Sequence, residues 1–117
     1  MKKFFHIRKR KDFLRTSSSG FYFRTDLFLA QAGRNASGIF RVGFTASKKV
    51  GNAVVRNRCK RRMRAVADLI LPKNGVIGLD YVFIAKKPIF NANWNIIVGS
   101  ALKAVGFLNN KIQKCKS

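Results

Sequence analysis

Alternation of apolar and polar side chains is clearest in residues 39–46 of this chain. The even-numbered positions from 40 to 46 are apolar and share one face, whereas Arg41, Gly43 and Thr45 share the other. This period-two pattern predicts a half-buried strand in an antiparallel pair. Residues 21–32 are rich in aromatic and β-prone side chains and predict one long strand or two strands joined by a bend. A short apolar run at residues 80–85 predicts a further strand.

Helical spacing of apolar residues marks three other segments. Residues 12–15 predict a short first helix that ends at the breaker Ser17-Ser18-Ser19-Gly20. Residues 52–71 predict a long helix with Asn52 as its N-cap and Pro72 as its stop signal. Residues 94–108 predict a last amphipathic helix. The apolar stripe of the long helix consists of Val55, Cys59, Met63, Val66 and Ile70, and the opposite stripe of Asn57, Arg61, Arg64 and Asp68.

The predicted elements follow one another as α-β-β-β-α-β-α if residues 21–32 bend, and as α-β-β-α-β-α if they do not. Strands and helices share one core in both cases, which places the chain in the α+β class. No internal repeat or long linker divides the 117 residues, so residues 1–117 are expected to form a single domain.

Charge is the most unusual property of the composition. The chain has 25 Lys and Arg residues against 4 acidic ones, which gives a formal net charge of +21, yet 47% of its residues are hydrophobic. It therefore has the material for a core and a surface that attracts polyanions, so nucleic acid is the leading partner. Residues 1–11 are expected to form a basic arm that is either solvated or in contact with phosphate.

The location of the protein follows from what the sequence lacks. Cys59 and Cys115 are far apart and suit neither a disulfide framework nor a structural zinc site. The apolar run at residues 4–7 is too short for a signal peptide, and no segment reaches the roughly 18 apolar residues of a membrane span. We expect a cytoplasmic protein with no membrane partner and no implied protein partner.

Residues for hydrolytic chemistry are scarce. Hydrolysis of a phosphodiester by protein groups needs paired carboxylates on metals or a general acid and base. The chain has one histidine, His6, and four aspartates scattered along the sequence, Asp12, Asp26, Asp68 and Asp80. Gly-rich phosphate-binding loops are missing as well. We therefore expect no catalytic residue and no metal or cofactor site in this chain.

The most informative segment is residues 47–64, SKKVGNAVVRNRCKRRMR, in which eight of eighteen residues are Lys or Arg. A solvated helix face is the plain interpretation of such a run. Two features favour binding of a polyanion instead. The basic residues almost encircle the predicted helix, and only Asp68 could relieve their repulsion. Lys48 and Lys49 also lie at the strand-to-helix junction, where a helix N-terminus already favours phosphate.

This segment, centred on Arg56-Asn57-Arg58, resembles the signature of the bacterial ribonuclease P protein subunit. The resemblance extends through residues 41–44, residues 81–88 and the early Lys11-Asp12-Phe13, so it covers most of the chain. It implies a protein that pairs with a large catalytic RNA, which removes the 5′ leader from precursor tRNA with Mg²⁺ bound mainly by the RNA. It also implies an α-β sandwich, similar to a domain of a small-subunit ribosomal protein, with a left-handed β-α-β crossover.

The resemblance also implies roles for single residues. Residues of the basic helix would face the RNA subunit, namely Arg56, Asn57, Arg58, Lys60, Arg61 and Arg64. A cleft would receive the single-stranded leader, with Phe13 on its wall, Leu29, Gln31 and Thr45 on its floor, and Lys48 and Lys49 beside it. The chain departs from the family pattern at two cleft positions, where Ser17 and Gln31 stand in place of aromatic residues.

Two other functions compete with this interpretation. A structural ribosomal or ribosome-assembly protein would also explain the charge, the lack of an active site and the mixed fold. A non-specific DNA-compacting protein would explain the charge alone. Only the protein subunit of an RNA-based endonuclease explains the ordered combination of Lys48-Lys49, the Asn52 cap and Arg56-Asn57-Arg58.

Overall fold

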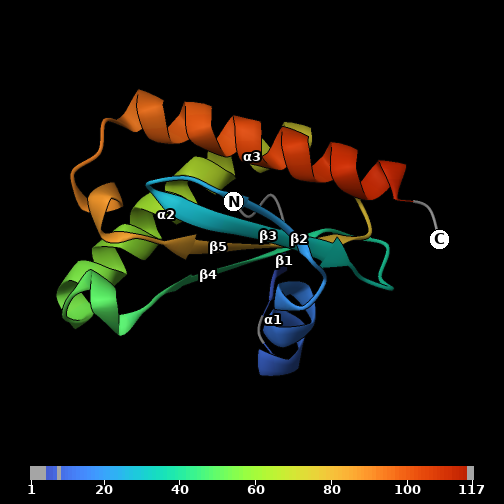
Figure 1. The fold of residues 1–117 in the computed structure, drawn as a ribbon, viewed down its shortest axis with the longest axis horizontal. Helices are drawn as coiled ribbons and strands as arrows, with labels where there is room; N and C mark the ends of the chain where they lie inside the picture. Colours follow the sequence, from blue (N-terminus) through green and yellow to red (C-terminus); the bar gives the residue numbers. More distant parts are fainter. Residues whose placement is uncertain (1–4, 8, 116–117) are drawn as a thin grey trace.

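The structure of this chain is a computed structural model that describes residues 5–7 and 9–115 (Figure 1). Its helices are α1 (Arg10–Ser17), α2 (Ala53–Asn74) and α3 (Trp94–Lys114), with the short 3-10 helices η1 (Lys48–Val50) and η2 (Lys87–Phe90). Its strands are β1 (Phe5–His6), β2 (Phe21–Arg24), β3 (Phe28–Arg34), β4 (Arg41–Ala46) and β5 (Leu79–Ala85). Of the basic arm expected at residues 1–11, Lys2, Lys3 and Arg8 lie outside the described residues.

The five strands form one mixed sheet in the order β1-β4-β5-β3-β2. Strand β3 is antiparallel to both of its neighbours, whereas β4 is parallel to both β1 and β5. The sequence prediction of an antiparallel partner for residues 39–46 was therefore wrong. The reason is the connection that follows β4. Helix α2 returns the chain to the edge of the sheet at which β4 begins, so β5 starts there and runs in the same direction as β4.

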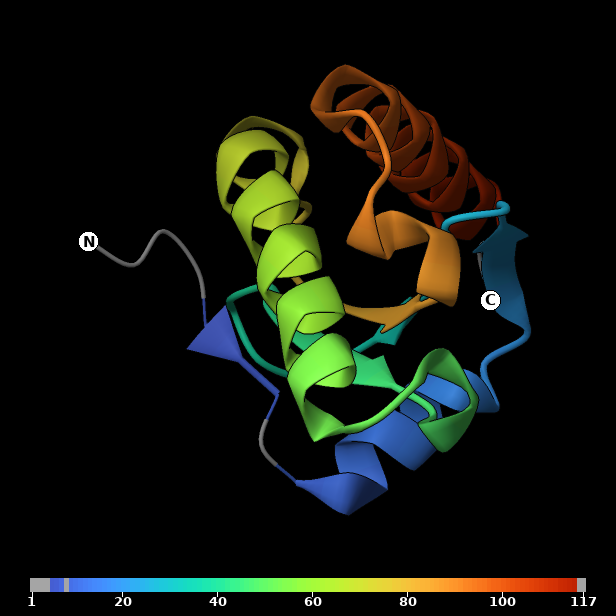
Figure 2. The ribbon, with the colours of Figure 1, turned by 90° about the vertical axis from the view of Figure 1, so that its left-hand side faces the viewer.

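This β4-α2-β5 connection has the less common hand. Seen with these two strands running toward the viewer, as in Figure 2, the chain passes clockwise from β4 through α2 to β5. The crossover is therefore left-handed, as the family resemblance implied, although parallel crossovers are right-handed in about 98% of cases.

Helices cover the two faces of the sheet unequally. Both long helices, α2 and α3, lie on one face, and the short α1 lies on the other (Figures 1 and 2). The buried core fills the space between the sheet and the two long helices. Its largest members include Phe28, Tyr81 and Phe83 from the strands and Met63, Leu71, Ile97, Leu108 and Ile112 from the long helices. Much of the opposite face is consequently left open around α1.

The α+β class and the order of elements from α1 to α3 are confirmed, with β1 as an additional strand. Residues 21–32 divide into β2 and β3 because the Thr25 hydroxyl accepts hydrogen bonds from the N–H groups of Leu27 and Phe28, both at 3.0 Å. The prediction that Pro72 stops the long helix was wrong, since α2 continues to Asn74. The Asn74 amide closes that last turn by donating to the carbonyl of Ile70 at 2.8 Å.

A buried aspartate ties α1 to the sheet. Asp80 is fully buried at the start of β5 and accepts hydrogen bonds from Arg41 at 2.7 and 2.8 Å, from Arg15 of α1 at 2.5 Å and from Asn35 at 2.8 Å. Asp12 of α1 also pairs with Arg15 at 3.1 Å and with Arg41 at 3.4 Å. Two aspartates that are far apart in the sequence thus meet around two shared arginines.

We predict that this network makes stability depend on acid pH. Burial alone raises the pKa of Asp80, but the hydrogen bonds from Arg41 and Asn35 and the charges of Arg41 and Arg15 outweigh it and hold the pKa below the ordinary value of 3.8. A carboxylate with a lowered pKa stabilises the fold above its unfolded pKa, and this contribution is lost as the pH falls further. The free energy of unfolding should therefore decrease below about pH 4.

Denaturant titrations from pH 7 to pH 2 would check this, with Asp80→Asn as the test variant and the exposed Asp26→Asn as its control. Asp80→Asn should lower the free energy of unfolding at pH 7 by about 3 kcal/mol, because it breaks a buried pair. It should also flatten the acid dependence, whereas Asp26→Asn should leave both nearly unchanged. Equal acid slopes for Asp80→Asn and the unsubstituted protein would contradict the assignment.

Candidate nucleic-acid interface

The junction between β4 and α2 is built from short-range interactions. The Asn52 side chain accepts a hydrogen bond from the N–H of Val55 at 3.0 Å, so the predicted N-cap is confirmed. Gly51 just before it has φ +151°, a conformation that other residues rarely adopt, and a Cβ there would lie 3.0 Å from the Val55 side chain. Lys48 and Lys49 are exposed on η1, directly ahead of this turn.

The long helix α2 has the two faces that the sequence predicts. Cys59, Met63, Val66 and Ile70 are buried against the core. The other face is exposed and carries Asn57, Arg61, Arg64 and Asp68. In the part of the chain that the structure describes, the salt bridges join only Arg15 and Arg41 to Asp12 and Asp80. No salt bridge within these residues therefore neutralises the cationic face of α2, which suits it to an external polyanion.

Three other arginines of α2 contact backbone carbonyls of neighbouring segments. Arg56 donates to the carbonyl of Gly51 at 2.9 Å. Arg58 donates to the carbonyl of Phe90 at 3.1 Å, and its guanidinium lies over the Phe90 ring at 4.7 Å from the centroid. Arg62 donates to the carbonyl of Ile89 at 2.7 Å. Arg58 and Arg62 thus hold η2 against α2, a structural contribution that the charge pattern alone did not indicate.

The open face of the sheet presents two rows of side chains that run across the strands. Cross-strand register places Gly43, Val82 and Gln31 side by side in one row, on β4, β5 and β3. The next row consists of Thr45, Ile84 and Leu29 on the same three strands. Gln31, Leu29 and Thr45, which the family resemblance assigned to a cleft floor, therefore share one face of the sheet.

Helix α1 turns this face into a groove. The Phe13 ring lies directly over Gly43, where a Cβ would be only 2.6 Å from two of the ring carbons. The resulting groove has a volume of about 460 Å³. It is lined by Arg10, Phe13, Leu14, Ser17, Gln31, Phe44, Thr45, Val82 and Ile84. Three of the six expected leader-binding residues, Phe13, Gln31 and Thr45, thus line it. Leu29 lies next to Ile84 in the same row as Thr45, and Lys48 and Lys49 lie beyond the end of β4.

Sequence reasoning missed several of these lining residues. Val82 and Ile84 belong to an apolar run without alternation, so nothing in the pattern shows that they face a groove. Arg10 and Leu14 flank Phe13 on α1, and helical spacing from Phe13 could have indicated Arg10, three residues earlier. Phe44 was assigned to the core face, and the structure shows it both stacked on the buried Phe83 and lining the groove.

The groove and the cationic face of α2 meet at Phe44. The Arg64 guanidinium lies 5.6 Å from the centroid of the Phe44 ring. A second recess of about 290 Å³ continues there, lined by His6, Ile7, Phe13, Val42, Gly43, Phe44 and Arg64. An extended polyanion on α2 could therefore continue into the groove without leaving basic or aromatic surface.

The titratable groups do not form a reactive constellation in the described part of the chain. Asp12 and Asp80 are held by arginines, and no three His, Cys, Asp or Glu residues there could hold a metal ion together. Burial raises the pKa of the Cys59 thiol, despite the opposing charges of Arg58 and Arg62. Burial likewise raises the pKa of Tyr81 to about 12. The basic and aromatic side chains around the groove and the recess are suited to binding an anion.

No helix in residues 5–7 and 9–115 is both long and apolar enough to cross a membrane.

Comparison with known proteins agrees with this geometry. The family model for ribonuclease P matches residues 1–108. The ribonuclease P protein component of Caulobacter vibrioides is 43% identical over 93 residues, which are 79% of this chain and 62% of that protein. The one from Paramagnetospirillum magneticum is 39% identical over 111 residues, covering 87% of this chain and 83% of the relative. The matched segment thus spans less than two thirds of the Caulobacter protein but most of the other.

A solved structure shows the same architecture. The RNase P protein of Staphylococcus aureus superimposes with a TM-score of 0.72 at 29% identity, covering 87% of this chain and 93% of that one. The fold, the open sheet face and the cationic helix define a small α+β protein suited to binding nucleic acid. More specifically, the chain belongs to the ribonuclease P protein family.

We predict that Gly43 is required for the position of Phe13. Gly43→Ala places a methyl group where the Phe13 ring lies, so it should destabilise the fold by about 1–3 kcal/mol, as overpacking does. In a Phe13→Ala background the space is free, and the same substitution should have little effect. Urea denaturation of the four proteins measures the coupling, which we expect to exceed about 0.5 kcal/mol. Equal losses in both backgrounds would mean that Phe13 does not pack on Gly43.

Proposed function

We propose that this chain is the protein subunit of a ribonuclease P ribonucleoprotein, the endoribonuclease that removes the 5′ leader from precursor tRNA. Its partners are then a catalytic RNA subunit and precursor tRNA, and the groups that cleave the phosphodiester lie in the RNA. The observation that carries this proposal is the continuity of two surfaces through Arg64 and Phe44, one cationic and helical, the other a groove. Curated relatives named as ribonuclease P protein components support it.

The RNA subunit is expected on the outer face of α2. Asn57, Arg61 and Arg64 are exposed there and can reach phosphate groups directly. Arg56, Arg58 and Lys60 are half-buried, and Arg56 and Arg58 keep one donor each on a backbone carbonyl. A guanidinium has five donors, so both can bind phosphate while they hold the protein backbone. We therefore assign all six residues to the RNA-binding surface. The exposed residues would contact phosphate directly, and the half-buried ones would contribute fewer contacts.

The groove under α1 is the proposed site for the leader. Unpaired bases stack on aromatic side chains, and cations follow the phosphates of a single strand. Phe13 supplies the aromatic wall, Gln31, Thr45 and Leu29 the floor, and Lys48 and Lys49 the positive charge beyond β4. Mature tRNA has no leader, so only the precursor would occupy the groove. The protein would thereby favour the substrate over the product.

Magnesium ions belong to the RNA in this proposal. Hard divalent cations take oxygen ligands, often from several carboxylates. Asp12 and Asp80 are the only carboxylates brought together in the described residues, and Arg15 and Arg41 already occupy them. The residues that the structure describes therefore do not fit a Mg²⁺ site. A ribonucleoprotein that processes tRNA in the cytoplasm is consistent with this chemistry, and the proposal requires no membrane or protein partner.

The identity of the RNA that copurifies with the tagged protein tests this proposal. One non-ribosomal RNA of several hundred nucleotides is expected, and the sequence of that RNA should allow precursor tRNA cleavage to be reconstituted with the protein. Ribosomal RNA as the main copurifying species would instead support a ribosomal or ribosome-assembly role.

We predict that Arg61 and Arg64 hold the RNA subunit mainly through phosphates. Each lost phosphate contact should reduce the slope of log K against log salt concentration by about 0.7–0.9. Arg61→Ala and Arg64→Ala should each show this reduction with little loss of stability, since both side chains are exposed. Lys103→Ala on α3 is the matched control, because it removes an exposed charge from another helix. A reduction at Lys103 equal to that at Arg61 would show that only net charge matters.

We also predict that Phe13 distinguishes precursor from mature tRNA. A base–aromatic stack contributes about 1–3 kcal/mol, so Phe13→Ala should weaken precursor binding to the holoenzyme by about 5- to 150-fold. Binding of mature tRNA should change little. Titration of both tRNAs, with a melting curve of each protein, checks the prediction. Equal losses for the two tRNAs in a variant of normal stability would rule out recognition of the leader by this residue.

A further inference from the structure

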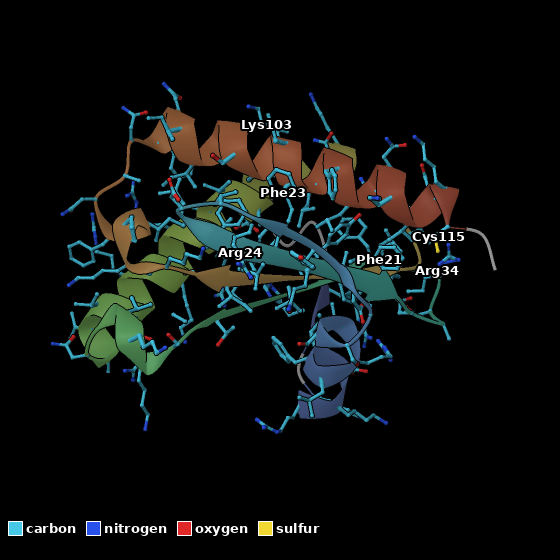
Figure 3. All side chains as sticks on the ribbon, in the orientation of Figure 1. Phe21, Phe23, Arg24, Arg34, Lys103 and Cys115 are labelled. Carbon is cyan, nitrogen blue, oxygen red and sulfur yellow. The ribbon has the colours of Figure 1, made fainter. Side chains whose placement is uncertain are left out.

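Tyr22 is an exposed aromatic residue on the outermost strand of the sheet. In β2, Phe21 and Phe23 are half-buried and face α3, and the Phe23 ring lies 5.2 Å from that of Phe107 (Figure 3). Alternation along the strand sends Tyr22 and Arg24 to the other face, where the Tyr22 side chain is 55% exposed. That face is the open one, which also carries the groove.

The register between β2 and β3 places Tyr22 and Arg24 at the ends of the two rows of the groove floor. Tyr22 pairs directly with Gln31, and Arg24 pairs directly with Leu29. The Cβ atoms of directly opposed residues lie about 4.5–5.5 Å apart, so their side chains are in contact range. Each row therefore continues across β2, the first ending at Tyr22 and the second at Arg24.

The two side chains also fit together chemically. The Arg24 guanidinium lies 6.0 Å from the centroid of the Tyr22 ring, so a cation lies beside an exposed aromatic face. Phe13 covers the β4 end of the first row, and Tyr22 forms its β2 end. Three strand spacings separate these ends, which is about 14 Å. A single strand of RNA that crosses the sheet would meet an aromatic residue at both ends.

We propose that Tyr22 and Arg24 form an outer subsite of the groove for single-stranded RNA. An unpaired base stacks on Tyr22, and Arg24 binds an adjoining phosphate. The proposal rests on the proposed function, because it extends the contact with the leader from β4 to β2. It assigns to Tyr22 an aromatic contact beside Gln31, a position whose own side chain cannot stack in the same way.

The experiment uses the reconstituted holoenzyme and precursor tRNAs whose leaders increase one nucleotide at a time. The test variants are Tyr22→Leu, which keeps an apolar side chain of similar bulk without a ring, and Tyr22→Phe, which keeps the ring. Phe107→Leu is the matched control, because Phe107 is a 41% exposed aromatic residue of α3 that packs on Phe23, on the opposite, helix-covered face of β2. Phe13→Ala reports separately on the inner part of the groove.

Tyr22→Leu should weaken binding by about fivefold or more once the leader is long enough to cross the sheet, as loss of one stack does. It should have no effect on mature tRNA, and Tyr22→Phe and Phe107→Leu should bind as the unsubstituted protein does. The Phe13→Ala loss should begin at a different leader length from the Tyr22→Leu loss. Arg24→Gln should reduce the salt slope for long leaders by about 0.7, the value for one phosphate of a single strand.

Two results would overturn the proposal in distinguishable ways. If Phe13→Ala depends on the leader and Tyr22→Leu does not at any length, the outer subsite is absent while the proposed function stands. If neither variant separates precursor from mature tRNA, leader recognition by the groove fails, and the outer subsite fails with it. A loss in Tyr22→Leu that is equal for every leader length and for mature tRNA would also exclude the subsite.

Discussion

The buried carboxylate of Asp80 is the interaction on which the functional surface depends. Asp80 joins Arg41 of β4, Arg15 of α1 and Asn35 of the β3–β4 connection in one hydrogen-bonded network. Helix α1 is only eight residues long, so such contacts rather than its own propensity must hold it on the sheet. With α1 in place, Phe13 covers Gly43 and the open sheet face becomes a groove.

Half of the acidic residues are used inside the fold, which leaves the surface strongly cationic. The chain has only four acidic residues, and two of them, Asp12 and Asp80, are involved in fixing α1. The cationic face of α2 forms no salt bridge among the described residues, and Asp68 is its one acidic residue. The arginines of α2 thus divide between packing and the exposed surface, with Arg58 and Arg62 holding η2 and Arg61 and Arg64 facing outward.

The floor of the groove depends on the register between strands more than on amino-acid composition. Two rows cross the sheet because the register of each strand pair places residues of the same face opposite one another. This holds for the parallel pair β4–β5 and for the antiparallel pairs β5–β3 and β3–β2. A shift of one residue in the pairing of β3 or β4 with β5 would move Gln31 or Thr45 to the core face. Both polar and apolar side chains, such as Gln31, Thr45, Val82 and Ile84, are available on this floor beneath the aromatic Phe13.

Local periodicity determined what the sequence alone could predict. The buried stripe of α2, its Asn52 cap, the strand at β4 and the outward position of Thr45 follow from side chains a few residues apart. The family resemblance added the roles of the basic helix and the left-handed crossover. Only tertiary structure decided the parallel pairing of β4, the meeting of Asp12 with Asp80 and the place of Tyr22 beside Gln31. These depend on pairing between distant segments, whose register no local pattern encodes.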